Sequence, residues 1–233
     1  MANTIKSNRF TPTLEGLESR EVPATLNWTC GSGNDTVYIH DDGDGNISFA
    51  VNGNWIGGSG GWHNVTTFNL NTGGGHDTVI YFQYAGDQTH PGSGAHNGVR
   101  ESNLDLNVNL GSGSDYFRAD ILGDIGANKI LDIDVNGGSG GDLLWAFAGY
   151  EWDGGPDRDV DVQQGATLRI DLDGDGGNDT MGSFYDGELD GVLDLYFRGD
   201  AGNDTLWRDV NFQPGSTGNW FWRYWSVGTK HLS

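Results

Sequence analysis

The sequence predicts an all-β chain that repeats a unit of strand, glycine–aspartate corner and strand. A short segment with a Gly two residues before an Asp, and an apolar residue two after it, recurs six times from residue 31 onwards. The segments that enter these corners alternate apolar and polar residues, which is the period of a half-buried strand. No long segment has the 3.6-residue period of an amphipathic helix.

Composition restricts the partners of the chain. The formal charge is −21 over 233 residues, which argues against nucleic acid or an anionic membrane surface as a partner. Of the 33 acidic residues, 27 are Asp and 6 are Glu, a bias typical of turns and oxygen-ligand loops rather than helix surfaces. No run of 18 apolar residues occurs, so no membrane span is expected. Cys30 is the single cysteine, so an intrachain disulfide is excluded.

The N-terminal residues 1–24 are predicted to be a disordered or targeting leader, and residues 25–233 a single β-repeat domain. Residues 14–24 read LEGLESREVPA. This string resembles the LExLESRxxPA leader of many bacterial surface and secreted proteins of planctomycete type. The resemblance implies an extracellular or cell-surface location in a bacterium.

Strands are expected before most corners. Residues 104–110 (LDLNVNL) place an apolar residue at every second position, and the later strands repeat this pattern. Residues 41–46 (DDGDGN) predict a hairpin tip, and residues 83–99 and 151–161 predict protruding loops. The expected entering strands are residues 66–70, 104–110, 130–135, 168–172 and 192–197.

The simplest architecture for these units is a β-solenoid, a β-helix-like stack with the corners aligned along one edge and the apolar alternates inside. A β-sandwich built from hairpins is the alternative. Neighbouring corner aspartates are separated by 42, 38, 27, 37 and 25 residues, so some turns carry inserted segments. The corner aspartates are Asp35, Asp77, Asp115, Asp142, Asp179 and Asp204.

The corners resemble the calcium-binding nonapeptide GGxGxDxUx of RTX (hemolysin-type) repeat proteins. Residues 137–144 (GGSGGDLL) match every fixed position, and residues 199–206 (GDAGNDTL) differ only by Asp200 at the second Gly. The resemblance implies that Ca²⁺ lies between stacked loops, bound by the Asp carboxylates and by carbonyls of the glycine-rich backbone. The chain departs from the family pattern because its copies are not in tandem every nine residues.

Calcium is therefore the predicted cofactor, since it prefers six to eight oxygen ligands. A second signal is the DxDxDG string of residues 171–176, which resembles the start of an EF-hand loop. The alternative is that each Asp only caps backbone N–H groups in a tight corner. Short connections are expected to stack best, so the site of Asp179 and Asp204 should be tightest and that of Asp35 and Asp77 weakest. The full set of candidate ligands is Asp35, Asp77, Asp115, Asp142, Asp171, Asp173, Asp175, Asp179, Asp200 and Asp204.

The C-terminal segment changes character. Residues 219–225 (NWFWRYW) contain five aromatic side chains, which predicts an aromatic cap over the open end of the stack. An exposed platform for sugar rings and a partner-docking strand are the alternatives. The cap would involve Trp220, Trp222 and Trp225.

These observations favour a calcium-binding structural or surface repeat protein rather than an enzyme. The histidines lack zinc-ligand spacing, and neither a nucleophile elbow nor a phosphate-binding loop occurs. The alternatives are a carbohydrate-binding or polysaccharide-lyase-like β-helix protein, with surface polysaccharide as a further candidate partner, and a metal-free adhesion scaffold.

Overall fold

The computed structural model describes residues 24–57, 61–84, 98–149 and 159–226, and every regular element in these ranges is a β-strand. The prediction of an all-β chain is confirmed. Sheet A contains seven strands in the order β1-β5-β8-β11-β13-β15-β17. Their bounds are β1 (Ala24–Thr29), β5 (Val65–Asn71), β8 (Leu104–Asn109), β11 (Ile130–Asn136), β13 (Thr167–Asp173), β15 (Val192–Asp200) and β17 (Asn219–Ser226).

Sheet B contains eight strands in the order β16-β14-β12-β9-β6-β2-β3-β4. The hairpin strands β3 and β4 lie at one edge, and the remaining strands are parallel. The bounds are β2 (Thr36–Asp41), β3 (Ile47–Val51), β4 (Asn54–Ile56), β6 (Thr78–Gln83), β9 (Tyr116–Ile121), β12 (Leu143–Ala148), β14 (Thr180–Gly187) and β16 (Thr205–Phe212).

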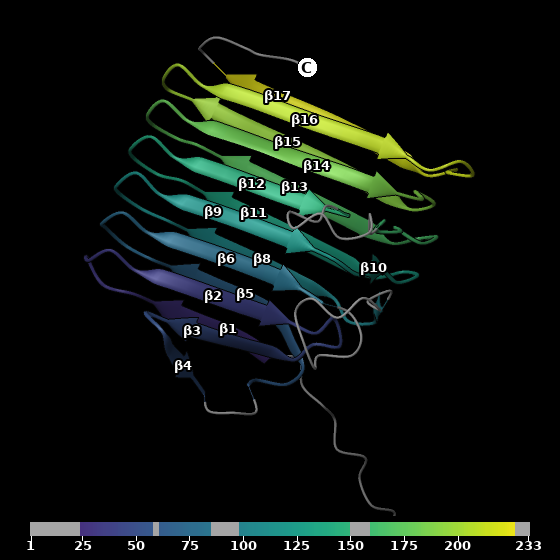
Figure 1. Ribbon diagram of the computed structural model, residues 1–233, viewed down its shortest axis with the longest axis horizontal. Coiled ribbons are helices and arrows are strands. Elements are labelled where there is room, and N and C mark those ends of the chain that lie inside the picture. The colour runs from purple at the N-terminus through teal and green to yellow at the C-terminus, as the bar shows by residue number, and fades with distance from the viewer. Residues whose placement is uncertain (1–23, 58–60, 85–97, 150–158, 227–233) are drawn as a thin grey trace, which may run out of the picture.

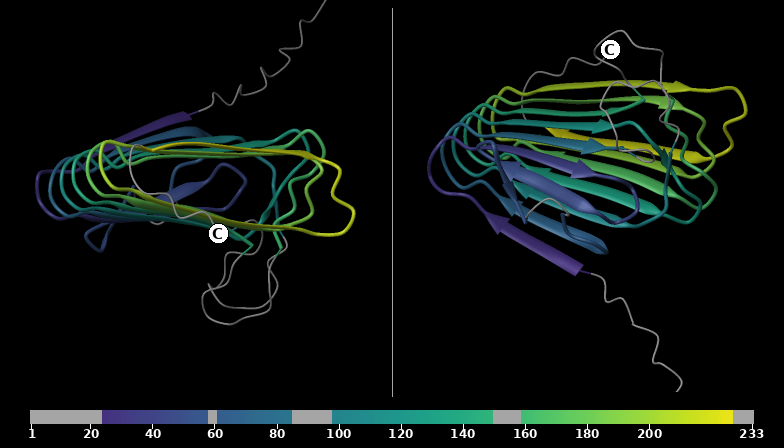
Figure 2. Two further views of the ribbon diagram at one scale, coloured as in Figure 1. Left: turned by 90° about the horizontal axis from the view of Figure 1, so that it is seen from above. Right: turned by 60° about the horizontal axis from the view of Figure 1, so that its bottom comes forward.

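The chain alternates between the two sheets. Each strand of sheet A before β17 leads through a glycine–aspartate corner to a strand of sheet B, and the chain then returns to the next position in sheet A. Figure 1 shows this as a steady change of colour from one end of the stack to the other, and Figure 2 shows the two layers from above. Hairpins would give antiparallel sheets, but among the described strands only β2–β3 and β3–β4 pair in that way.

The core lies between the sheets because strand alternation points one apolar row of each sheet inward. In sheet A the in-register residues Leu106, Ile133 and Ile170 are fully buried. Sheet B faces it with residues such as Phe117 and Leu144. Each large apolar side chain buried in this way stabilises the fold by about 1.5–3 kcal/mol. Register is thereby fixed, since a shift of one residue would turn every apolar column to solvent.

A short third ladder lies on the side of the stack opposite the corners. It consists of β7 (Val99–Arg100) and β10 (Asp124–Ile125), extended by bridges through Val162 to Leu189. Arg100 points inward from it and is fully buried. Its guanidinium group pairs with Asp41 at 2.5 Å, and the hydroxyl of Tyr81 donates to the same carboxylate oxygen. This buried ionic group links the third ladder to sheet B.

The expected strands agree with the structure. Each predicted segment coincides with β5, β8, β11, β13 or β15 to within three residues at either end, and the predicted hairpin tip connects β2 to β3. The predicted loops at residues 83–99 and 151–161 fall mostly outside the described residues, and residues 1–23 of the predicted leader lie outside them too. No helix in the described ranges is long and apolar enough to cross a membrane.

Candidate metal centre

The glycine–aspartate corners stack directly on one another. A continuous row of parallel bridges joins Gly74, Ser112, Ser139, Gly176 and Ala201, one from each successive corner. Backbone N–H groups of one corner donate to carbonyls of the neighbouring corners, as from Ser139 to Gly111 of the previous corner at 2.8 Å. The corners therefore form a backbone ladder of their own between the two sheets.

Close approach of these backbones explains the recurring glycine. A Cβ atom on Gly140 would lie 1.3 Å from the carbonyl oxygen of Gly113, and one on Gly177 would meet the carbonyl oxygen of Gly140 at the same distance. Gly140 also has a φ of +141°, in the region that favours glycine. Gly33, in the first corner, has no preceding corner against it, and a Cβ there would meet nothing within 4 Å.

The corner aspartates form a second ladder, here called the aspartate ladder. Each Oδ1 from Asp77 onward accepts a hydrogen bond from the backbone N–H of the previous corner aspartate. The distance is 2.7 Å from Asp35 N to Asp77 and 3.1 Å from Asp179 N to Asp204. The members are Asp35, Asp77, Asp115, Asp142, Asp179 and Asp204.

The second carboxylate oxygen of most ladder members is buried without a hydrogen-bond partner among the described residues. These are the Oδ2 atoms of Asp35, Asp77, Asp115, Asp142 and Asp179. The Oδ2 of Asp204 instead accepts from the hydroxyl of Ser226 at 3.1 Å. In the later corners Oδ2 lies against the first glycine of the motif, since a Cβ on Gly137 would be 2.6 Å from the Oδ2 of Asp142.

Burial raises the pKa of several ladder carboxyls. The pKa of Asp179 rises to about 7, mainly through desolvation, although the N–H of Asp142 hydrogen-bonds its carboxylate and lowers it. The same causes raise the pKa of Asp115 to about 6. Neighbouring carboxylates in the ladder add to both shifts. A row of buried, closely stacked acids favours either a proton or a cation as a neutralising partner.

Three other carboxylates converge at the outer edge of the last two corners. Ligand oxygens of Asp173, Asp175 and Asp200 all lie within 4.8 Å of one another. Asp173 ends β13 and is buried, whereas Asp175 and Asp200 occupy the second position of adjacent corners. We call this group the aspartate triad.

The backbone brings the triad together. Asp175 and Asp200 have φ values of +56° and +47°, at positions where earlier corners have the glycines Gly73, Gly111 and Gly138. Asp tolerates this left-handed conformation better than most residues. The carbonyl of Asp175 accepts from the N–H of Ala201, which stacks the two corners and aligns their acidic side chains.

The triad has few neutralising neighbours. Arg198 contacts the Oδ2 of Asp173 at 2.9 Å, and the side-chain amide of Asn136 donates to Asp175 at 2.8 Å. Desolvation raises the pKa of Asp173 to about 6, while the N–H of Asp175 and the charge of Arg198 lower it. Three carboxylates whose ligand oxygens lie this close together could hold a metal ion.

The structure separates the predicted ligands into groups. Asp173, Asp175 and Asp200 meet in the triad, and the six corner aspartates form the ladder. Asp171 lies on the outer face of sheet A between Arg169 and Arg198, at 3.7 and 3.4 Å. The EF-hand-like interpretation of residues 171–176 is wrong as a loop assignment, because Asp171 and Asp173 belong to strand β13.

Sequence separation did not determine how closely the corners stack. Asp35 and Asp77 are 42 residues apart, yet their link of 2.7 Å is as short as any in the ladder. The expectation that the shortest connection gives the best stacking is therefore wrong. The hairpin strands β3 and β4 take up inserted residues at the edge of sheet B, away from the corners.

Sequence reasoning missed Arg198 and Asn136. Both follow from strand register, which pairs Asp173 with Arg198 on one side and with Asn136 on the other. Aligning the entering strands on the corner glycines would have found them.

The aromatic C-terminal strand only partly matches the predicted cap. The guanidinium carbon of Arg208 lies 4.1 Å from the ring centre of Trp222 and 5.1 Å from that of Trp220, and Trp222 packs against the core. Trp225 pairs with Arg198 on the outward row of sheet A and is 63% exposed. It therefore does not belong to the cap.

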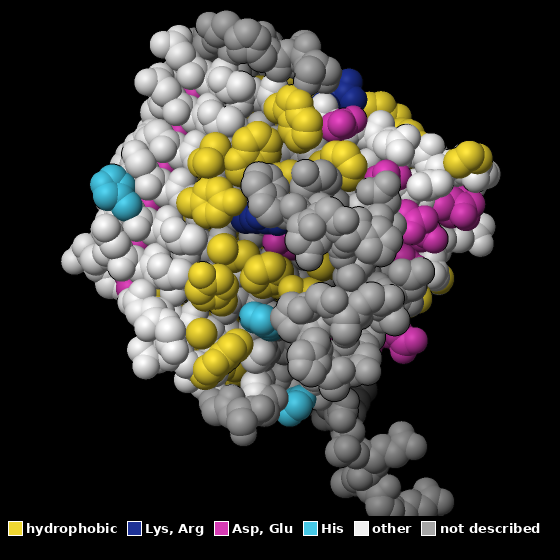
Figure 3. Space-filling model, in the orientation of Figure 1, with side chains coloured by type: hydrophobic (Ala, Val, Ile, Leu, Met, Phe, Trp, Pro, Cys, Tyr) yellow, Lys and Arg dark blue, Asp and Glu magenta, His cyan; other side chains and the backbone are white. Residues whose placement is uncertain are grey.

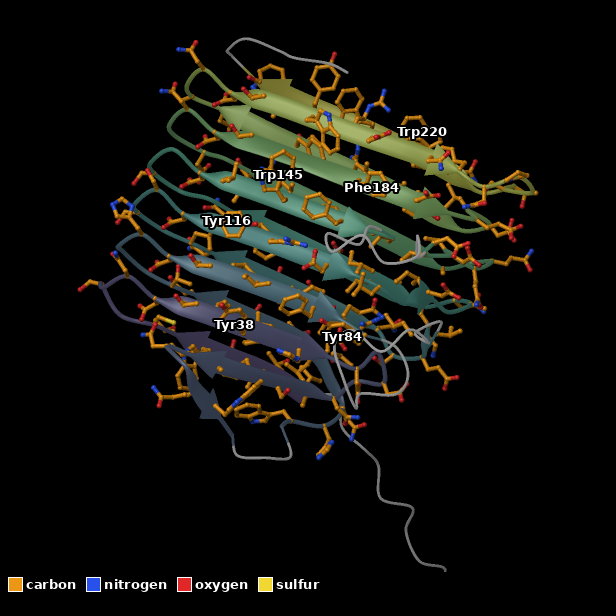
Figure 4. All side chains as sticks on the ribbon, viewed as in Figure 1. Tyr38, Tyr84, Tyr116, Trp145, Phe184 and Trp220 are labelled. Carbon is orange, nitrogen blue, oxygen red and sulfur yellow. The ribbon has the colours of Figure 1, made fainter. Side chains whose placement is uncertain are left out.

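A second concentration of aromatic side chains lies on the outer face of sheet B. Figure 3 shows the apolar surface, and Figure 4 shows Tyr38, Tyr116 and Trp145 on successive parts of this face. Trp145 leans over Gly182 toward Trp207, with ring centres 5.8 Å apart. The aromatic surface that the polysaccharide-binding alternative requires is therefore also present away from the C-terminal strand.

Comparison of the chain with protein-family models, with curated proteins and with solved structures finds no match.

Proposed function

We propose that this chain is a calcium-binding structural protein, a β-solenoid displayed outside a bacterial cell. The solenoid assignment rests on the alternation of parallel strands between two sheets with the corners stacked along one edge. The extracellular location rests on the leader-like string of residues 14–24. In this proposal Ca²⁺ serves the fold and not a reaction.

The single observation that carries the calcium proposal is the aspartate triad. Two of its members stand at left-handed backbone positions that glycine occupies in other corners, and their oxygens converge with that of Asp173. Three carboxylates supply up to six oxygens, and water can complete the six to eight that Ca²⁺ takes. Arg198 neutralises only part of this charge.

The bound ion would act by relieving repulsion. A chain with a formal charge of −21 repels itself in the compact state, and the three carboxylates of the triad converge at the last two corners. A cation that binds only the folded state stabilises it by about 2.7 kcal/mol at a hundredfold excess over Kd. The aspartate ladder, with its unpartnered Oδ2 atoms, is a second place where the RTX-like resemblance puts calcium.

The test is calcium titration by calorimetry on chelator-treated protein, with Asp175→Asn plus Asp200→Asn as the variant. Asn keeps the left-handed backbone but removes two charges. We expect the affinity of the triad to fall by roughly a hundredfold or more, because each carboxylate is a direct ligand. Thermal melts with and without Ca²⁺ should then differ less in the variant than in the parent chain.

The matched control is Asp44→Asn plus Asp209→Asn, which removes the same charge from two exposed positions. It should leave calcium affinity within about twofold, since distant surface charges are screened by salt. Equal losses of calcium affinity in the two double variants would show that the effect depends on net charge and not on the triad. Absence of any calcium binding by the parent chain would contradict the proposal.

A further inference from the structure

The outer face of sheet A carries two regular rows of asparagine side chains. Strand register aligns Asn27 of β1 with Asn69 of β5 and Asn107 of β8, which form the first row. Two residues further along the same strands, Asn71 and Asn109 form the second row, which continues to Asn136 of β11. The two rows run along the stack, with one amide per strand in each.

A shallow groove of about 360 Å³ runs between the rows. Its floor is the backbone of the intervening residues, because Leu70 and Val108 turn their side chains into the core. The groove crosses β1, β5, β8 and β11, so it is straight and lies parallel to the stacking direction.

The rows differ in how much of their hydrogen-bonding capacity is used. In the first row, the amide of Asn69 donates to Asn27 at 2.9 Å, and that of Asn107 donates to Asn69 at 3.0 Å. In the second row, Asn71 and Asn109 are exposed, and their side chains make no hydrogen bond to another described residue. Each of these amides offers two donors and one acceptor oxygen to a ligand.

This part of the face is almost uncharged, although the whole chain carries −21. Strands β1 and β5 contain no charged residue, and β8 contains only Asp105, which accepts from Asn107 at 3.0 Å. Among the described residues, the one charged residue that lines the groove is the exposed Asp134 of β11, beside Asn107, and its carboxylate disfavours an anionic ligand. The described residues that line the groove include no Lys or Arg to neutralise an anionic ligand. A partner for the groove must therefore be neutral and rich in groups that both donate and accept hydrogen bonds.

We propose that this groove binds an extended, neutral polysaccharide laid along the stack. Successive sugar rings of an extended glycan repeat on a scale close to the spacing of about 4.8 Å between strands. Each ring can then meet one amide of Asn71 or Asn109 with its hydroxyl groups. A straight groove favours a straight chain, so β-1,4-linked glucose chains fit and curved α-1,4-linked chains do not. The groove adjoins the aspartate triad at Asn136, whose amide donates to Asp175. The proposed sugar ligands Asn71 and Asn109 lie on β5 and β8, which are not neighbours of β13.

The test titrates the full chain with cellohexaose, a straight β-linked glucose oligomer, and with maltohexaose, its curved α-linked counterpart. We expect cellohexaose to bind and maltohexaose not to. Asn71→Ala plus Asn109→Ala should weaken cellohexaose binding roughly tenfold, since two amide hydrogen-bonding groups are lost. Asn54→Ala plus Asn211→Ala, which alters two exposed positions of sheet B, should leave binding unchanged.

Side-chain amide signals in NMR spectra give a second measurement that does not depend on a variant. Those of Asn71 and Asn109 should shift on addition of cellohexaose and stay in place with maltohexaose. The proposal is overturned if the parent chain binds neither oligomer, binds both equally, or shows shifts only at the aromatic face of sheet B around Trp207. The proposal is also overturned if light scattering shows that the chain self-associates through sheet A and thereby blocks the groove. The face would then be an interface with a second copy of the chain.

Discussion

The glycine two residues before each corner aspartate lies where the backbones of neighbouring turns approach most closely. The carbonyl oxygen of the previous corner occupies the place that a Cβ atom would take, so only glycine, which carries a hydrogen atom there, lets the turns stack. The first corner is different, since no earlier corner of the described stack lies against Gly33. The same glycine in the motif is therefore obligatory in five copies and dispensable in one.

Gly140→Ala tests this directly. We expect a loss of about 3 kcal/mol in the free energy of unfolding, or failure to fold, because the new Cβ overlaps the carbonyl of Gly113 and the backbone has a positive φ. Gly33→Ala is the matched control and should change stability by less than about 1 kcal/mol. Denaturant unfolding measures both. Similar losses from the two substitutions would show that glycine serves flexibility and not close approach.

At the scale of the element, the position of a strand and its register with neighbouring strands have to be predicted separately. Alternation alone located β8, β11 and β13, because a period of two is visible in one sequence. Register was not visible, since it depends on which strands become neighbours. The three residues of the triad were all among the candidate ligands, but only register shows that Asp173 meets Arg198. The structure also places Asp171 outside the triad.

The last strand, β17, shows the same division between pattern and register. Its concentration of aromatic residues predicts a cap, but register decides which side of the sheet each ring faces. Trp222 turns toward Arg208 and the core, whereas Trp225 turns outward. Sequence alone gives the same weight to both residues.

Two alanine variants therefore separate the roles within β17. Trp222→Ala should destabilise the chain by about 2–3 kcal/mol, because it removes partly buried aromatic surface and the contact with Arg208. Trp225→Ala should cost less than about 0.5 kcal/mol, as an exposed substitution usually does. Thermal and denaturant unfolding report the difference. A larger loss from Trp225→Ala would contradict the assignment of the cap.

At the scale of the whole molecule, negative charge is the dominant constraint. Stacking places like residues above like, so a repeat that contains Asp generates rows of carboxylates in the folded state. Some of these rows are relieved by arginine, as where Arg198 bridges Asp171 and Asp173. Others are relieved only by a proton or, in the proposed function, by calcium. The stability of the fold should therefore decrease as the pH rises.

Burial is the main cause that raises the pKa of Asp179 to about 7 and that of Asp124 to about 6. A carboxyl whose folded pKa lies above its ordinary value of 3.8 binds its proton more tightly in the folded state. Its contribution to stability is complete below about pH 4 and is lost as the pH rises towards 7. In divalent-free buffer, Tm should be lower at pH 8 than at pH 5 by roughly 5 °C, given that 1 kcal/mol shifts Tm by about 2–4 °C at this size.

The origin of that pH dependence can be located with Asp124→Asn, at a site away from the triad. Asn keeps an oxygen that accepts from the N–H of Asp161 but cannot ionise, so the difference in Tm between pH 5 and pH 8 should shrink. Asp44→Asn, at an exposed hairpin position, should shrink it less. Added Ca²⁺ should raise Tm more at pH 8 than at pH 5, because the ion competes with protons for the same carboxylates. A divalent-free chain that becomes more stable as the pH rises from 5 to 8 would show that its buried acids are already neutralised by their protein partners.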